Sequence, residues 1–121
     1  MPHRLAAAVG AFGQRVAERY LVDQGLVVLD RNWRCRIGEI DLVARDGDCL
    51  VVCEVKTRRG SAFGTPAESV TWAKLARLRR LAAAWAAAHP EHSWGDIRVD
   101  VVGVVRPPSG PSLVEHLKGV G

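Results

Sequence analysis

The stretch GEIDLVARDGDCLVVCEVKTR, from Gly38 to Arg58, decides the fold. Its first part, Gly38–Arg45, alternates strictly between two faces, which predicts a β-strand. One face carries Ile40, Leu42 and Ala44, and the other carries Glu39, Asp41 and Val43. Asp46-Gly47-Asp48 then predicts a tight turn, because Asp-Gly tolerates the positive φ that hairpin turns need. Cys49–Thr57 is predicted to return as an antiparallel partner.

The returning strand is apolar from Cys49 to Val52, yet it carries a glutamate and a lysine further on. Residues two apart share a face of a strand, so Glu54 and Lys56 are predicted to project together. If the hairpin turns at residues 46–48, its register brings Asp41 near Glu54. One face of the sheet would then present two carboxylates beside an ammonium group.

Such a group is costly to bury, because an unpaired charge in a low-dielectric interior costs several kcal/mol. A divalent cation would relieve the repulsion, and hard oxygen ligands suit Mg²⁺ or Mn²⁺. Lys56 would then orient an attacking water or offset charge on a phosphate, and phosphodiester hydrolysis needs these parts. Spacing alone leaves a second interpretation open, namely cross-strand ion pairs on a solvated face, worth about 0.2 to 1 kcal/mol each.

The rest of the chain completes an α/β pattern. The further elements are a helix over Ala7–Gln24, a strand over Leu26–Trp33, a helix from Thr65 to His89-Pro90, and a strand over Ile97–Val105. The second helix is expected to begin with Thr65 as N-cap, Pro66 as first helical residue and Glu68 in a capping box. The order helix, three strands, helix, strand indicates a sandwich with a mixed four-stranded sheet. We expect residues 1–105 to form one domain and the Pro/Gly-rich tail 106–121 to be loosely held.

The charge of the chain is concentrated in one segment. The 121 residues carry a net charge of +4, but the segment from Lys56 to Arg80 holds seven basic residues and one acid, or +6. The remaining ten basic and twelve acidic residues give −2. A basic zone on a mildly acidic body favours phosphate binding, although a solvated helix face explains the charge equally well.

Other features limit the class of protein. No segment approaches the roughly 18 apolar residues of a membrane span, and the N-terminal LAAAVGAFG lacks a cleavage site, so we expect a cytoplasmic protein. Cys35, Cys49 and Cys53 show no zinc spacing and are expected to be buried free thiols. The fold is therefore expected to need neither a disulfide nor a cofactor. His89 and His92 flank Pro90 and are only weak candidates for metal binding.

With GEIDLVARDG, LVVCEVKTR, FGTP, Lys74 and RVDVV, the sequence resembles the YraN-like (UPF0102-type) family of small bacterial proteins. That family belongs to the restriction-endonuclease-like, PD-(D/E)xK, nuclease superfamily and is similar to archaeal Holliday-junction resolvases. The resemblance covers roughly Gly13 to Val105. It implies a restriction-endonuclease-like sandwich and a nuclease that uses Mg²⁺ or Mn²⁺.

The resemblance also assigns the site residue by residue. It implies Asp41 and Glu54 as metal ligands, the backbone carbonyl of Val55 as a further ligand, and Lys56 as the catalytic lysine. The chain departs from the family on the first helix, where the usual glutamate is replaced by Gln14. The remaining accessory candidates are Glu18, which points more toward solvent at about 100° per residue, and Glu39, whose role the pattern does not define.

The basic residues would hold a phosphate backbone. The candidates are Arg58, Arg59, Lys74, Arg77 and Arg80. The first hypothesis is a metal-dependent endonuclease that cleaves DNA, including branched or repair intermediates; junction cleavage would require a homodimer. The alternatives are a nucleic-acid-binding or adaptor protein with little turnover, and an interaction module whose carboxylates pair with arginines.

Overall fold

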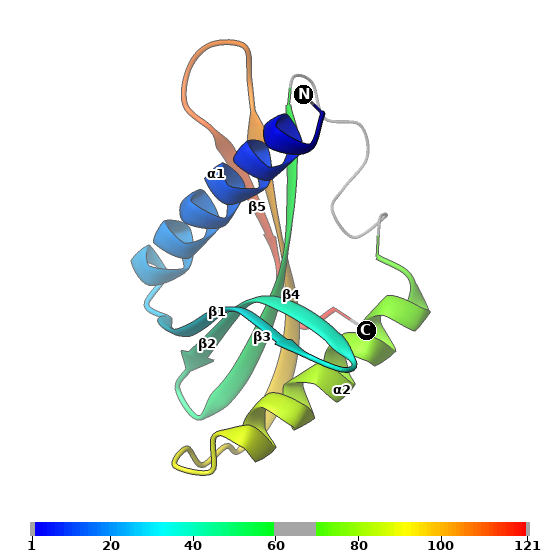
Figure 1. Cartoon of the computed structure of the whole chain (residues 1–121). Coiled ribbons are helices and arrows are strands. Elements are labelled where there is room, and N and C mark those ends of the chain that lie inside the picture. Colours follow the sequence, from blue (N-terminus) through cyan, green and yellow to red (C-terminus); the bar gives the residue numbers. More distant parts are fainter. Residues whose placement is uncertain (1, 60–69, 121) are drawn as a thin grey trace.

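The computed structural model of the chain describes residues 2–59 and 70–120, with side chains from residue 9 onward. The described part is a mixed α/β fold with two helices and five strands (Figure 1). In chain order the elements are α1 (Pro2–Asp23), β1 (Val27–Cys35), β2 (Gly38–Asp46), β3 (Cys49–Arg59), α2 (Trp72–Ala88), β4 (Asp96–Arg106) and β5 (Leu113–Leu117).

The strands form one sheet in the order β1-β2-β3-β4-β5. The β3–β4 pair is parallel, whereas the other three pairs are antiparallel, so the predicted mixed sheet is confirmed. Parallel neighbours need a long crossover, and α2 lies within the segment that joins β3 to β4. β3 is therefore a central strand, with β2 on one side and β4 on the other.

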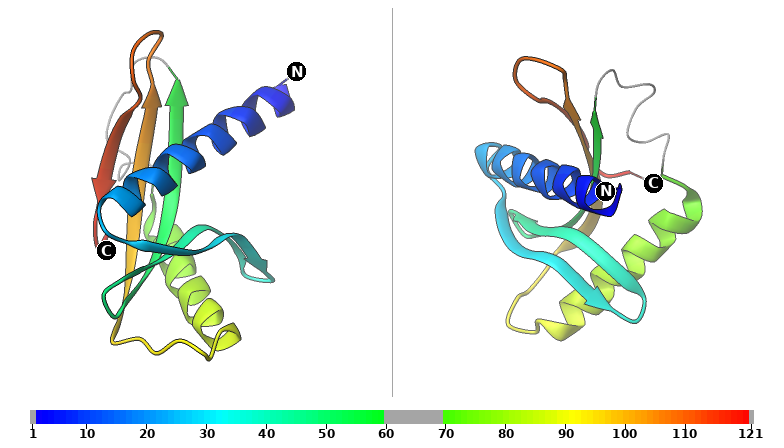
Figure 2. Two further views of the ribbon diagram at one scale, coloured as in Figure 1. Left: turned by 90° about the vertical axis from the view of Figure 1, so that its left-hand side faces the viewer. Right: turned by 45° about the horizontal axis from the view of Figure 1, so that its top comes forward.

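The two helices cover opposite faces of the sheet (Figures 1 and 2). Leu50 and Val52 of β3 pack in a buried cluster with α2, which includes Trp85. The alternate residues Val51 and Cys53 pack in a second cluster with α1. A strand that is apolar on both faces is buried on both faces, which explains the continuous hydrophobic run at the start of β3.

α1 approaches β3 closely at a glycine, Gly13. A Cβ atom at Gly13 would overlap Oγ1 of Thr57, and it would lie only 2.8 Å from Cβ of the same threonine. Because real Cβ atoms do not come this close, any larger residue at position 13 would force the helix and the strand apart. The absence of a side chain at Gly13 therefore sets the distance between α1 and β3.

The prediction of four strands was wrong, because residues 113–117 add a fifth strand beside β4. The tail is also tied to the sheet beyond β5, where the backbone N–H of Gly119 donates to the buried carboxylate of Asp100 (3.0 Å) and that of Val120 donates to the carbonyl of Val99 (2.8 Å). The short segment LVEHL offers little periodicity. Its place in the sheet depends on contacts with distant residues.

The predicted start of the second helix was also wrong. The described helix begins at Trp72, with Thr71 as N-cap, whose side chain accepts a hydrogen bond from the backbone N–H of Lys74 (3.1 Å). Thr71 therefore performs the role that was assigned to Thr65, which lies with Pro66 and Glu68 outside the described residues. The C-terminal end was predicted correctly, since His89 is the C-cap.

The strict alternation predicted for β2 fails at Ile40. Leu42 and Ala44 face α1 as one set, but Ile40 packs in the cluster on the α2 face together with Val43. β2 pairs with β3 only from Leu42 onward, and its earlier residues pair with β1 alone. The freed end of the β1–β2 hairpin lies against α2, where a Cβ at Gly38 would stand 3.7 Å from the side chains of Arg77 and Leu81.

We expect Gly13→Ala to lower the free energy of unfolding by about 1 to 3 kcal/mol, because the new methyl group overpacks the contact with Thr57. Urea denaturation measures the change. Gly10→Ala on the same helix is the matched control: a Cβ there meets no atom within 4 Å, so it should stabilise the protein by about 0.5 to 1 kcal/mol. Equal stability of the Gly13→Ala protein and the wild type would contradict the close packing of α1 on β3.

Candidate functional site

Asp41 and Glu54 lie together where the β2–β3 pairing ends. The ladder ends at the pair of Leu42 with Cys53, and beyond it the side chain of Asp41 replaces the backbone as partner. Oδ2 of Asp41 accepts a hydrogen bond from the backbone N–H of Val55 (2.8 Å). The hairpin register therefore brings the Asp41 and Glu54 carboxylates close together, as the alternation of the two strands predicts.

The environment of Asp41 disfavours its negative charge. Burial is the main cause that raises its pKa from 3.8 to about 6, and the nearby charges of Glu54 and Glu39 act in the same direction. The hydrogen bond from the Val55 N–H acts in the opposite direction but is weaker. A partly buried carboxyl with a raised pKa beside other acids is typical of functional sites, and a cation bound here would relieve the repulsion.

Glu54 is buried, with only 6% of its surface exposed. A single oxygen, Oε2, lies 3.2 Å from Nζ of Lys56 and 2.5 Å from Nζ of Lys74. Lys56 projects from the same strand, as predicted, whereas Lys74 reaches across from α2. Sequence reasoning assigned Lys74 to phosphate binding alone and did not predict its contact with Glu54.

Two open clefts meet at this site. The first, here called the acidic cleft, has a volume of about 370 Å³ and is lined by Gly38, Glu39, Asp41, Glu54, Val55, Lys74, Arg77, Leu78 and Leu81. The second, the basic cleft, has a volume of about 380 Å³ and is lined by Lys56, Thr71, Ala73, Lys74, Arg77 and Arg80. Lys74 and Arg77 line both clefts, so a ligand in the basic cleft would reach the carboxylates directly.

Gln14 also reaches the carboxylates from α1. Its Nε2 donates to Oδ1 of Asn32 (2.9 Å) and weakly to Oδ1 of Asp41 (3.4 Å). Asn32 adopts a positive φ of 51° in β1, which turns the strand locally. Gln14 therefore stands beside Asp41, but as a hydrogen-bond donor rather than as a charged ligand.

The other two accessory candidates are engaged elsewhere. Glu18 forms a two-pronged ion pair with Arg31, whose Nε lies 2.6 Å from Oε1. This pair lowers the pKa of Glu18, and it holds the carboxylate on β1 rather than on Asp41. Glu39 lines the acidic cleft, but its Oε2 pairs with Nε of Arg34 (3.0 Å). Among the described residues, neither glutamate forms a hydrogen bond with Asp41 or Glu54.

The donor set suits a hard cation with few protein ligands. Among the described residues no three His, Cys, Asp or Glu side chains gather at one point, so a metal would find two carboxylates here. Magnesium is usually bound by one or two carboxylates, with water and phosphate oxygens completing its octahedron. Asp41 and Glu54 fit that requirement. The carbonyl of Val55 stays a predicted ligand.

The remaining basic candidates are divided between the faces of the sheet. Arg77 and Arg80 line the basic cleft, as expected for phosphate contacts. Arg58 follows Glu54 and Lys56 in the alternation of β3 and continues their face. Arg59 belongs to the opposite face, where it lines a separate cleft with Arg106. The two adjacent arginines therefore do not form one edge.

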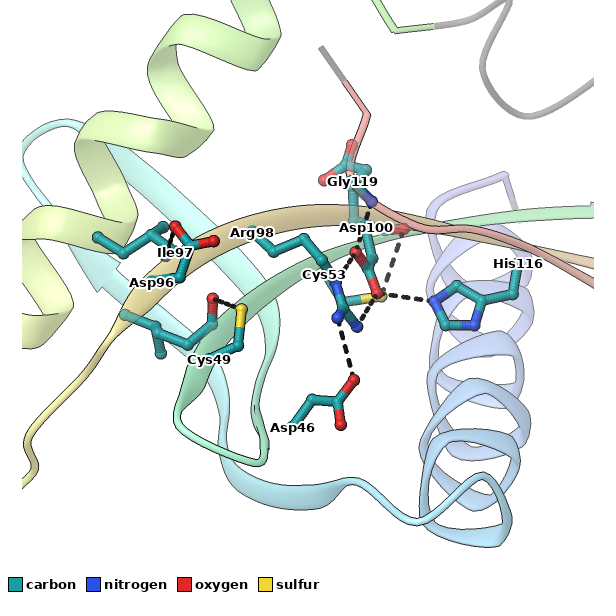
Figure 3. Close-up of polar contacts among 11 residues, drawn as sticks. Asp46, Cys49, Cys53, Asp96, Ile97, Arg98, Asp100, His116 and Gly119 are labelled. Carbon is teal, nitrogen blue, oxygen red and sulfur yellow. Dashed lines mark hydrogen bonds and ion pairs between the residues drawn. The ribbon is translucent and has the colours of Figure 1, made fainter.

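A buried charge cluster on the α1 face was missed by the sequence analysis (Figure 3). Asp100 of β4 is fully buried, and its carboxylate accepts hydrogen bonds from the guanidinium of Arg98 (2.8 and 3.0 Å), from Nε2 of His116 (2.7 Å) and from Gly119. Arg98 also binds Asp46 (3.0 Å). The only signal in the sequence was an aspartate inside the apolar strand RVDVV.

The cluster lowers the pKa of Asp100: burial, the largest single influence, acts to raise it, but the combined hydrogen bonds from Arg98, Gly119 and His116 outweigh burial. Its carboxylate is thus saturated with donors and joins β4 to β5 and the segment after it. The role of Asp100 is structural, because each carboxylate oxygen already has two partners.

The cysteines and histidines form no further site in the described residues. The three cysteines are free; Cys53 is buried, with a pKa raised by burial, whereas Cys35 and Cys49 are only partly buried. The ring of His89 stacks on Trp85 with centroids 4.0 Å apart, so it belongs to the packing at the end of α2. No described helix is long and apolar enough to cross a membrane.

We expect Asp41→Asn to stabilise the metal-free protein by about 1 to 3 kcal/mol near pH 8. Folding raises the pKa of Asp41 from 3.8 to about 6, so its contribution to stability is fully present below pH 3.8 and is lost as the pH rises through 6. Asparagine keeps an oxygen for the Val55 N–H without the charge. Urea denaturation in chelator at about pH 5, 6.5 and 8 measures the growing difference.

Asp96→Asn provides a control for that experiment, since Asp96 is an exposed aspartate at the start of β4. Its stability difference from the wild type should stay nearly constant over the same pH range. A constant difference for Asp41→Asn would contradict the raised pKa.

The chain can now be compared with known proteins. A model of the uncharacterised protein family UPF0102 matches residues 13–104. The chain is 61% identical over 117 residues to a UPF0102 protein of Kineococcus radiotolerans, which covers 97% of this chain and 96% of that protein. It is 58% identical over 114 residues to a UPF0102 protein of Nocardioides sp., with 94% and 91% covered.

A third relative, from Streptomyces coelicolor, is 55% identical over 114 residues, with 93% of this chain and 88% of that protein covered. The family predicted from the GEIDL and EVKTR blocks is thereby confirmed. With a family model that spans most of its length and relatives that align almost from end to end, the chain belongs to the UPF0102 family.

Proposed function

We propose that this protein is a metal-dependent endonuclease that hydrolyses phosphodiester bonds in DNA. The observation that carries the proposal is the pair of carboxylates, Asp41 and Glu54, that meets at the end of the β2–β3 ladder beside two lysines. This pair opens into a cleft that continues into a basic one. Fold and site together agree with a PD-(D/E)xK nuclease sandwich.

The carboxylates are arranged to hold a cation. The pKa of Asp41 is raised by burial and by neighbouring negative charge, which a bound Mg²⁺ or Mn²⁺ would compensate. When bound, such an ion polarises the phosphate and lowers the pKa of water, which supplies the nucleophile. The Val55 N–H fixes the orientation of Asp41 through Oδ2, so the site is organised before any ligand arrives.

The two lysines provide positive charge on either side of Glu54. Lys56 is 29% exposed and lies on a rigid strand, so its ammonium can orient water or offset charge on a phosphate. Lys74 is equally exposed and lines both clefts. An anionic substrate would share these ammonium groups with Glu54, and a cation at Glu54 would compete with them.

The basic cleft supports a polyanionic substrate. Arg77 and Arg80 are exposed on successive turns of α2, and Thr71 begins the same helix. Contacts of this kind bind phosphates regardless of base sequence. A homodimer, which paired cuts in a DNA junction would require, remains part of the proposal.

A second candidate function is DNA binding with little or no turnover. The observation that favours it is Gln14, which stands beside Asp41 with its amide nitrogen where the family usually has a carboxylate. A site with two carboxylates attracts a cation less strongly than a site with three. Salt-sensitive DNA binding without cleavage in either Mg²⁺ or Mn²⁺ would select this function.

We expect Glu54→Ala to reduce DNA cleavage at least about 100-fold, because it removes a metal ligand that supplies several kcal/mol of transition-state stabilisation. Lys56→Met should have a similar effect on cleavage but should leave Mn²⁺ binding intact. Cleavage of linear, flapped and four-way DNA with Mg²⁺ and Mn²⁺ measures activity, and Mn²⁺-induced stabilisation against heat measures binding. Glu115→Ala, an exposed glutamate on β5, is the control with the same change of charge. Activity that survives both site substitutions would contradict the proposal.

Gln14→Glu should strengthen Mn²⁺ binding by about tenfold, since it adds a carboxylate next to Asp41. Titration of thermal stability with Mn²⁺ gives the affinity. Gln24→Glu, at the exposed end of α1, adds the same charge away from the site and should change little. Equal Mn²⁺ affinity in both variants would mean that position 14 does not influence the metal.

A further inference from the structure

A second basic cleft lies at the far end of strands β3 and β4. It has a volume of about 440 Å³ and is lined by Arg59, Arg106, Pro107 and Pro108. Arg59 and Arg106 are direct neighbours in the parallel register of the two strands, and both are exposed. We call this feature the Arg59–Arg106 cleft. Arg106 was not among the residues that the sequence assigned to phosphate binding.

The Arg59–Arg106 cleft faces away from the carboxylates. On β3, Val55 and Thr57 face α1, and Arg59 continues that set. On β4, Val102 and Val104 pack in the α1 cluster, and Arg106 continues it beside Phe12 of the same helix. Glu54 and Lys56 belong to the alternate set of β3. The sheet therefore separates the Arg59–Arg106 cleft from the acidic and basic clefts.

The two guanidinium groups are placed for an anion. Adjacent like charges on neighbouring strands repel each other, and no ion pair joins either arginine to a carboxylate within the described side chains. The guanidinium of Arg106 lies over the ring of Phe12, 4.9 Å from its centroid. Such stacking orients the group while leaving its N–H edge available for two-pronged binding of a phosphate.

The distance between the clefts corresponds to a few nucleotides. Arg59 lies three residues beyond Lys56, which is about 10 Å along a strand. In duplex DNA one strand carries a phosphate about every 3.4 Å along the helix axis, so a duplex would cover this length along β3 in about three nucleotides. A strand that touches both faces of the sheet must turn sharply over this length. A duplex resists such a turn, since its persistence length is about 150 base pairs.

We propose that Arg59 and Arg106 bind the backbone of an unpaired strand as it leaves the acidic cleft, so that the substrate carries single-stranded nucleotides next to the bond that is cut. This inference rests on the proposed nuclease function and specifies its substrate class. The ligand of the Arg59–Arg106 cleft is the phosphate of single-stranded DNA, bound without regard to base sequence.

The experiment measures binding in the Glu54→Ala protein, which holds DNA without cutting it. Three labelled probes are compared: a blunt duplex, and two versions of it that carry a single-stranded extension at one end or at the other. Arg59→Gln and Arg106→Gln should each reduce the slope of log affinity against log salt by about 0.7 on the extended probes. Between about 50 and 200 mM salt this is a change of about threefold in affinity. On the blunt duplex neither variant should change the slope.

Lys118→Gln is the matched control. It removes one positive charge from an exposed residue far from the Arg59–Arg106 cleft. Its neighbour Gly119 donates a hydrogen bond to Asp100, and Asp100 lies six residues before Arg106 on β4, which is about 20 Å along the strand. Its slope should equal that of the parent protein on every probe. Arg106→Gln could also act through lost packing on Phe12; Arg59→Gln excludes this effect, because Arg59 lies over no aromatic ring of the described residues.

The other outcomes overturn the inference in distinguishable ways. An equal loss of slope on blunt and extended probes would mean that the cleft binds duplex, and no loss on any probe would mean that it does not touch DNA. In both cases cleavage by the wild-type protein would leave the proposed function standing. If the wild-type protein neither binds nor cleaves any probe, the proposed function fails first, and this inference fails with it.

Discussion

The candidate site depends on one hydrogen bond, from the backbone N–H of Val55 to the carboxylate of Asp41. At this point β2 stops pairing with β3, and a side chain takes over the role that a backbone carbonyl has elsewhere in the ladder. The exchange has two effects. It places a carboxylate next to Glu54, and it frees the end of the β1–β2 hairpin to lie against α2, which closes one wall of the acidic cleft.

Asp100, which is fully buried, and Asp41, which is partly buried, illustrate opposite uses of the same residue type. The carboxylate of Asp100 accepts four hydrogen bonds from groups of the protein itself, and its pKa is lowered. Asp41 has few donors and acidic neighbours, and its pKa is raised. On the α1 face, the carboxylate of Asp100 thus joins parts of the sheet. On the α2 face, the carboxylate of Asp41 is left available for a ligand.

The parts of the fold that follow from local rules could be predicted from the sequence. Alternation and the Asp-Gly turn fixed the hairpin register, and with it the approach of Asp41 to Glu54, because both depend on residues close in the chain. The family was evident from the same blocks. The N-cap was assigned to Thr65 because Pro66 and Glu68 complete a capping box there, whereas Thr71, the N-cap of the described helix, is followed by no such pattern.

The failures share a physical cause, since each depends on distant contacts. Ile40 changes face because the hairpin bends toward α2, which no periodicity encodes. β5 forms because its backbone pairs with β4 and its His116 binds Asp100. The segment LVEHL by itself is too short to be recognised as a strand. The contact between Lys74 and Glu54 arises from the packing of α2 on the sheet. Charge and spacing predicted that Glu54 and Lys56 share a face of β3, but they did not predict the contact with Lys74.

The sharing of one Glu54 oxygen by Lys56 and Lys74 has a consequence for the order in which ligands bind. Lys74 cannot neutralise Glu54 and a phosphate equally well at the same time, so an anion that attracts its ammonium group leaves Glu54 more open to a cation. Thermodynamic linkage then requires that the cation increase the affinity for the anion by the same factor. The proposed substrate and metal ion would therefore bind cooperatively, without any change of fold, because the side chain of Lys74 responds to both.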